Sequence, residues 1–157
     1  MEITKQALRD KVKVSVFALE YDSADVFQFS ILHTVKRKND RIDFSVLLSI
    51  KQKERVDTEA VIRLIKLEEG EESTSALSFT LNSFSLSPEQ RKSALHNSVV
   101  SSGENPKFKW DPYEYNDYLK LNFRNVPVVG AGYYAVAVCV DVEDSTLVLD
   151  KQYFQVD

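Results

Sequence analysis

The chain has little of what most catalytic and metal sites require. It contains one cysteine, two histidines and four glycines in 157 residues, and neither histidine has a second ligand at zinc-site spacing. A glycine-rich phosphate loop, a dinucleotide fingerprint and a Gly-x-Ser-x-Gly elbow are all missing from the sequence. We therefore expect no metal, no cofactor and no enzymatic activity. The alternative is an enzyme whose site is assembled from distant loops, because such a site leaves no local motif.

The scarcity of cysteine and the lack of long apolar runs and of positive net charge also indicate the compartment and the kinds of partner. With Cys139 as its single cysteine, the chain has no intramolecular disulfide, and we expect this thiol to pack inside a strand. No apolar run approaches the roughly 18 residues that span a bilayer, and the first residues lack the apolar core of a secretory signal. The formal net charge of -4 disfavours nucleic acid and anionic membrane surfaces. These features predict a cytoplasmic protein that binds neither.

Alternation of apolar with other residues is abundant. The last forty residues carry three such runs, punctuated by Pro127, Gly130 and Gly132, and this pattern is typical of a closing β-meander. Earlier runs follow the same period of two, with no alternating helices between them. The predicted strands cover residues 12–17, 27–35, 42–50, 60–67, either 77–81 or 77–86, 119–123, 133–142 and 147–156. The fold class predicted is all-β, a single immunoglobulin-like or related β-sandwich of about eight strands.

Helical signals are short. The sequence Ser87-Pro88-Glu89-Gln90 has a capping residue, a proline at the first helical position and a glutamine three residues after the cap, which predicts the start of one short helix. Residues 1–11 suit either a short helix or a tail. We expect residues 87–118 to be an irregular excursion containing the short helix, and residues 1–157 to form one domain.

The strand patterns also predict which residues are buried. On the run 133–142, one face carries large apolar residues and the other carries the small Ala135, Ala137 and Cys139, a pattern that suits a sheet packed on both sides. The residues expected in the core are Phe29, Ile31, Phe44, Val46, Leu48, Ile65, Phe79, Leu121, Val136 and Val138.

One segment stands out as a candidate contact surface. Residues 108–118 crowd five aromatics, among them the single tryptophan, into a predicted connection. Large amphipathic rings in a connection suit contacts with a protein or a sugar. The alternative is that the inward-facing rings anchor a long crossing segment to the domain. The candidate partner contacts are Phe108, Trp110, Tyr113, Tyr115 and Tyr118.

The edges of a sandwich offer a second contact mode. An edge strand has unpaired backbone amides and carbonyls that pair with another chain unless charges or loops cover them. We therefore expect a non-catalytic protein-binding or assembly module, acting on a protein partner or self-associating as a homo-oligomer. The alternative is a carbohydrate- or small-ligand-binding β-sandwich, in which Trp110 and a neighbouring tyrosine stack on sugar rings.

Two stretches carry a resemblance to known proteins. Residues 41–81, with Ile42-Asp43-Phe44-Ser45-Val46 followed by Ala60-Val61-Ile62-Arg63-Leu64, resemble an uncharacterised family of small bacterial β-sandwich proteins. The ending from Asn125-Val126-Pro127 to Tyr153-Phe154-Gln155-Val156 is similar to the closing strands of immunoglobulin-like domains. The resemblance implies a sandwich fold and a bacterial or phage setting, and it supplies no catalytic residues.

Overall fold

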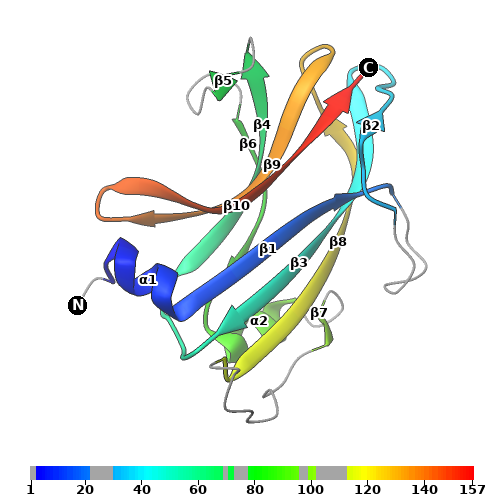
Figure 1. Cartoon of the computed structure of the whole chain (residues 1–157). Helices are drawn as coiled ribbons and strands as arrows, with labels where there is room; N and C mark the ends of the chain where they lie inside the picture. Colours follow the sequence, from blue (N-terminus) through cyan, green and yellow to red (C-terminus); the bar gives the residue numbers. More distant parts are fainter. Residues whose placement is uncertain (1–2, 22–29, 69–70, 73–77, 96–98, 102–112) are drawn as a thin grey trace.

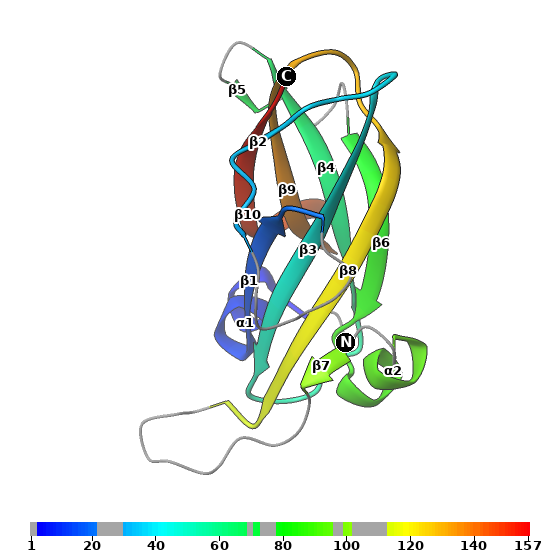
Figure 2. The same ribbon diagram turned by 90° about the vertical axis from the view of Figure 1, so that its right-hand side faces the viewer.

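The computed structural model describes residues 3–21, 30–68, 71–72, 78–95, 99–101 and 113–157. Strands dominate this part of the chain, together with two short helices, α1 (Lys5–Lys11) and α2 (Pro88–Ala94) (Figure 1). The predicted all-β class is confirmed. Both helices lie toward the end of the sheets that is opposite to the C-terminus (Figures 1 and 2).

The first sheet has the strand order β1-β3-β8-β7 and is antiparallel throughout. Its long strands alternate apolar residues with a period of two, so that one face is buried. A register shift between Ile42 and Phe44 of β3 marks a bulge in the pairing of β3 with β8. The bounds are β1 (Val12–Leu19), β3 (Arg41–Gln52), β7 (Val99–Ser101) and β8 (Tyr115–Pro127).

The second sheet follows the order β2-β10-β9-β4, and both β5 and β6 pair with β4. Its pairings are antiparallel except for the two residues of β2, which run parallel to β10. The bounds are β2 (Thr34–Val35), β4 (Glu59–Glu68), β5 (Glu71–Glu72), β6 (Ser78–Ser85), β9 (Gly132–Val142) and β10 (Ser145–Val156).

The two sheets share one core. Phe44 of β3 lies 5.7 Å from Phe154 of β10 between ring centroids, and Phe154 stacks on Tyr134 of β9 at 6.2 Å. Such aromatic contacts add to the stabilisation that comes from apolar burial. The buried residues that the core draws from both sheets include Val14, Val16, Val46, Leu48, Ile50, Ile62, Leu64, Leu119, Leu121, Val136, Val138 and Val140.

Side chains of β10 close the gap between the two sheets at the β1 edge. The backbone N–H of Val16 donates to Oδ2 of Asp150 at 2.7 Å, and that of Ala18 donates to Oε1 of Gln152 at 2.8 Å. These amides would otherwise be unpaired, because β1 has a strand neighbour on one side only. Inward-pointing polar side chains therefore protect this edge from pairing with another chain.

The strand order can be compared with that of immunoglobulin domains. Without the two-residue strands β2 and β5, the sheets read β1-β3-β8-β7 and β10-β9-β4-β6. Naming the eight strands A, B, C, C′, D, E, F and G along the chain gives the orders A-B-E-D and G-F-C-C′. These are the orders of the two sheets of immunoglobulin-like domains.

The excursion expected at residues 87–118 is shorter than predicted. It contains α2 and β7, and β8 begins within it at Tyr115. The sequence hides the start of β8 because its third residue, Asp117, is charged and yet faces inward, where a buried arginine of α2, Arg91, pairs with it. The predicted helix itself is confirmed, although the Ser87 side chain makes no capping bond to the backbone and donates to Glu89 instead.

Six of the ten residues expected in the core lie in it, namely Phe44, Val46, Leu48, Leu121, Val136 and Val138. Phe79 was wrongly assigned, because β6 has a neighbour on one side only and leaves 40% of this residue exposed. Ile65 is buried outside the shared core, in a small cluster with Ala137 and Cys139. Ile31 is half-buried, and Phe29 lies outside the described residues.

The strand expected over residues 27–35 is wrong for the part that the structure describes. There, only Thr34 and Val35 form a strand, β2, while Ile31 makes a single bridge with Leu19 of β1. The alternation continues through Leu32 and His33, but the chain changes partner there: the N–H of Leu32 donates to Ala18 of β1, and the carbonyl oxygen of His33 accepts from Gln155 of β10. Neither helix in the described part of the chain has the length and apolar character needed to cross a bilayer.

Candidate functional site

The outward face of the second sheet carries two exposed tyrosines. Tyr133 of β9 is 57% exposed and Tyr153 of β10 is 46% exposed. Small side chains follow Tyr133 along β9, because Ala135, Ala137 and Cys139 alternate there with the core residues. This strip lies between β10, which carries Tyr153, and β4. We call this the tyrosine face and define it by Arg63, Ile65, Tyr133, Ala135, Ala137, Cys139, Lys151 and Tyr153.

No described element covers the tyrosine face. Helix α1 packs beside β1 and helix α2 beside β6, so both lie away from the middle of β9 (Figures 1 and 2). The small residues are nevertheless buried, since longer side chains on the neighbouring strands flank them; Ala137, for example, lies opposite Lys151 on one side and Arg63 on the other. Residues 134–140 of β9 are therefore buried on both faces, as the small residues predicted, and on the outward face neighbouring side chains provide that burial.

Two cations contribute to the electrostatics of the tyrosine face. The Nζ of Lys151 lies 5.5 Å from the ring centroid of Tyr153, within the range of a cation–π contact. The Nε of Arg63 is buried and has no hydrogen-bond partner among the described residues. A buried donor without a partner is uncommon and costs free energy.

The structure places only part of the aromatic segment singled out in the sequence. Phe108 and Trp110 lie outside the described residues. Tyr113, Tyr115 and Tyr118 are all half-buried. In β8, Tyr115 shares the phase of the inward-facing Asp117 and Leu119, whereas Tyr118 lies on the opposite face. The described tyrosines of this segment therefore do not gather on one surface.

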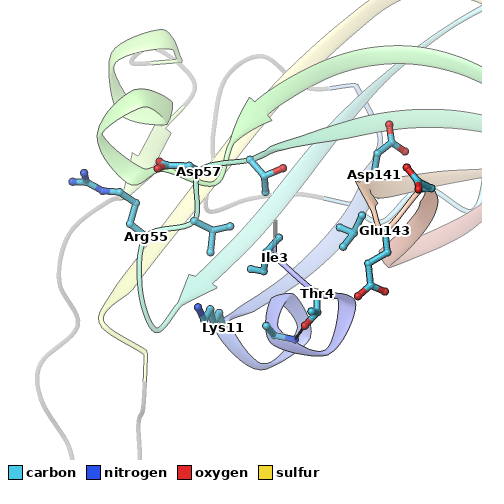
Figure 3. A pocket seen from close by; sticks show the side chains of 12 residues that line it. Ile3, Thr4, Lys11, Arg55, Asp57, Asp141 and Glu143 are labelled. Atoms are coloured by element: carbon cyan, nitrogen blue, oxygen red, sulfur yellow. Dashed lines mark hydrogen bonds between the residues drawn. The ribbon is translucent and has the colours of Figure 1, made fainter. Parts of the chain in front are cut away.

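A groove of about 830 Å³ lies between α1, the β3–β4 connection and the β9–β10 turn (Figure 3). Its apolar lining includes Ile3, Val56 and Val142, and carboxylates approach from the side of β9. Figure 3 shows Asp141 and Glu143 on that side and Arg55 on the other, directed away from the groove. The volume suits a small ligand.

Both cations that line this groove are engaged in ion pairs. Lys11 pairs with Glu54, and Arg55 pairs with Glu89 of α2. Oδ1 of Asp141 accepts a 3.0 Å hydrogen bond from the Thr146 hydroxyl. No group of three histidine, cysteine or acidic side chains in the described part of the chain is arranged to hold a metal ion. The groove therefore presents apolar residues, paired cations and carboxylates that are not arranged as a metal site.

A deeply buried polar cluster lies where α2 packs against β3, β6 and β8. Arg91 of α2 is 0% exposed, and its guanidinium donates to Asp117, to Oε1 of Gln52 and to the carbonyl oxygen of Ser85. Burial lowers the pKa of Arg91, and the hydrogen bond to Asp117 opposes that change. The guanidinium still stays charged near neutral pH, because its ordinary pKa exceeds 12. With all these donors satisfied, the cluster ties α2 to β8 and β3.

The positions of two tyrosines in the sequence already indicate the tyrosine face. Tyr133 and Tyr153 both fall on the strand faces opposite to Tyr134 and Phe154, which belong to the core. Large rings beside alanines on the face opposite to the core are compatible with two structures, an outward apolar surface or a sheet covered by a second layer. The Arg91–Asp117 pair had no local signal, since its members lie 26 residues apart.

Comparison with known proteins adds no relative. A scan against models of protein families finds no match, and no curated protein matches the chain.

Proposed function

We propose that the protein is a non-catalytic binding or assembly module whose contact surface is the tyrosine face. The observation that carries this proposal is the exposure of Tyr133 and Tyr153 beside a strip of small residues that no described element covers. Tyrosine is enriched in protein interfaces because its ring supplies apolar area and its hydroxyl keeps a polar contact. The small residues are buried under the longer side chains of Arg63 and Lys151, so the two tyrosine rings and these two cations supply the accessible contact area.

A protein partner fits this surface better than a sugar. A stacked sugar needs an open ring face, and Lys151 lies over the ring of Tyr153. The carbohydrate alternative retains Tyr133 as its stacking platform, and binding of an oligosaccharide that is lost in Tyr133→Ser would favour it.

We further propose that residues 1–157 form one immunoglobulin-like β-sandwich, as the resemblance of the closing strands suggests. Support comes from the strand order and from Tyr134, near the start of β9. Its hydroxyl accepts from the N–H of Val129 and lies 3.0 Å from the carbonyl oxygens of Val129 and Gly130. A tyrosine that bonds back to the corner between strands E and F is a hallmark of immunoglobulin domains.

Site-specific photo-crosslinking tests the contact surface. The photoreactive residue p-benzoylphenylalanine replaces Tyr153 in one variant and Phe17 in the matched control. Phe17 is comparably exposed, at 37%, but lies on the first sheet. Each variant is irradiated both as the purified chain and in a lysate of the native host, and adducts are identified by mass spectrometry.

We expect an adduct with a protein, or with a second copy of the chain, at position 153 and not at position 17. Adducts at both positions in equal yield would show non-specific contact and contradict the proposal. The absence of any adduct at position 153 would also contradict it.

A further inference from the structure

The strand edges of this fold differ in how well they are protected. The edge of β1 is capped by Asp150 and Gln152 of β10. Beyond β7, the edge of β8 carries Lys120, Arg124 and Pro127, and charges and proline on an edge discourage pairing with another chain. The two-residue strand β5 consists of Glu71 and Glu72.

Strand β6 lacks these devices. Its eight residues, Ser78–Ser85, include no charged residue and no proline, and in the described part of the chain it pairs with β4 alone. Figure 2 shows β6 at the right-hand margin of the second sheet, beyond β4. The exposed Phe79 adds apolar surface to this edge. Among the described residues, two side chains bond its backbone: Oδ1 of Asn82 accepts from the N–H of Ser83 at 2.8 Å, and Arg91 of α2 donates to the carbonyl oxygen of Ser85 at 2.8 Å.

The sequence of β6 is nearly the same in both directions. Read from the centre between Leu81 and Asn82, it has Thr80 and Ser83, then Phe79 and Phe84, then Ser78 and Ser85. A bulge at Leu81 keeps the symmetric partners on matching faces: Phe79 and Phe84 lie opposite the core residues Leu64 and Ala60, while Thr80 and Ser83 lie opposite Arg63 and Val61. Antiparallel pairing of two copies of β6 would therefore place like residues opposite each other.

We propose that two copies of the chain associate through β6, antiparallel about a two-fold axis at Leu81 and Asn82. This inference rests on the proposed assembly role and names its partner as a second copy. The pairing supplies the edge amides and carbonyls of β6 with acceptors and donors, which is the basis of recognition by strand addition. A two-fold arrangement closes on itself, so it yields a dimer and not a fibre.

Charge also favours β6 over the rest of the surface for this contact. The chain carries a formal net charge of -4, so two copies repel each other on average. An uncharged strand avoids adding to that repulsion. The paired β6 strands join the second sheets of both copies into one continuous sheet, and the two tyrosine faces then belong to one larger outward surface.

Disulfide trapping tests the register. All variants carry Cys139→Ala, so that only introduced thiols react. In the proposed pairing, residue 80 of one copy lies opposite residue 83 of the other, at the roughly 4.5–5.5 Å Cα separation that a disulfide can bridge. The two copies of residue 80 are offset by three residues along the paired strands, which is about 10 Å. That distance is too long for a disulfide. We expect covalent dimers from the double variant Thr80→Cys, Ser83→Cys and none from either single variant.

A second pair of variants tests the edge without thiols. Thr80→Lys with Ser83→Lys places like charges opposite each other across the two-fold axis, and both positions are exposed in the single chain. The control, Ser145→Lys with Thr146→Lys, adds the same charge to exposed positions at the β9–β10 turn. Sedimentation equilibrium is expected to show a dimer for the wild type and the control, with a dissociation constant raised about tenfold or more in the β6 variant.

Three outcomes would overturn the inference. The first is a wild-type chain that sediments as a monomer at all concentrations. The second is a dimer that the β6 lysines leave unchanged, and the third is trapping that is equally efficient in single and double cysteine variants. None of these outcomes touches the proposed function, because an adduct with another protein at position 153 would still support the tyrosine face. Conversely, a β6 dimer with no adduct at position 153 would leave self-association standing and remove the tyrosine face.

Discussion

The Nε of Arg91 donates a 2.9 Å hydrogen bond to Oδ2 of Asp117, and both side chains are almost completely buried. Removing one member of such a pair leaves an uncompensated charge in the protein interior. We expect Arg91→Ala to lower the free energy of unfolding by about 3–5 kcal/mol, measured by urea denaturation. Arg55→Ala, which breaks the exposed pair with Glu89, is the matched control and should change stability little. A loss in Arg91→Ala no greater than in the control would contradict the structural role of the buried pair.

Removing the Asp150 side chain that caps β1 should lower stability and open the β1 edge to aggregation. In Asp150→Ala, the N–H of Val16 loses its acceptor and the β1 edge becomes open. Leaving a buried donor unpaired costs about 1–3 kcal/mol, and light scattering should detect faster aggregation on heating because an unprotected edge pairs with other chains. Asp57→Ala removes an exposed carboxylate from the β3–β4 connection and serves as the control. If both variants aggregate at the wild-type rate, Asp150 does not protect the edge.

The Tyr134 hydroxyl predicts a loss of stability at alkaline pH. Burial raises the pKa of Tyr134 above its ordinary value, and the backbone hydrogen bond from Val129 opposes that rise. A group whose pKa is higher in the folded state stabilises the fold fully below its unfolded pKa of about 10, and this stabilisation is lost as the pH rises through the folded pKa. Unfolding free energy should therefore fall above about pH 10.

The variant Tyr134→Phe separates this effect from general alkaline unfolding. It removes the hydroxyl bonds to the 129–130 corner and should cost about 0.5–1.5 kcal/mol at neutral pH. Its stability should also fall less steeply than that of the wild type above about pH 10. Parallel pH profiles of the two proteins would show that Tyr134 is not the titrating group.

The turn between β9 and β10 offers a stabilising change. Glu143 and Asp144 both have positive φ angles, 53° and 59°, which suit the two-residue turns that join antiparallel strands but strain side chains other than glycine. We expect Asp144→Gly to raise the free energy of unfolding by about 0.5–1 kcal/mol, since the left-handed region costs a side chain about 1–2 kcal/mol. Thr146→Gly, within β10, should instead destabilise. A melting temperature lowered by Asp144→Gly would contradict this account of the turn.

Much of the fold was predictable because strand periodicity is local. The runs beginning at Val12, Ile42, Ala60, Tyr133 and Leu147 all lie in strands of the structure. The neighbours of each strand were not predictable, since they follow from packing between distant segments. The cap of Val16 by Asp150, for example, joins residues 134 positions apart.

The candidate site was harder to predict for the same physical reason. Exposure depends on the neighbours that a strand acquires: Phe79 fits a core pattern but lies on an edge, while Asp117 fits a loop pattern but is buried beside Arg91. The aromatic segment that drew attention in the sequence has its described tyrosines on different faces. Tyr133 and Tyr153 lie 20 positions apart in sequence and are brought onto one face by the pairing of β9 with β10.

We propose that the tyrosine face binds a protein without anchoring the fold. To test this, the wild-type chain and the variant Tyr133→Ser, Tyr153→Ser serve as immobilised baits in a lysate of the native host. Captured proteins are quantified by mass spectrometry, and the unfolding free energy of each bait is measured in parallel. We expect at least one protein, or the chain itself, to be captured about tenfold less by the variant, while its unfolding free energy changes by less than about 1 kcal/mol. Capture of the same proteins in the same amounts, or a loss of several kcal/mol of stability, would contradict the claim.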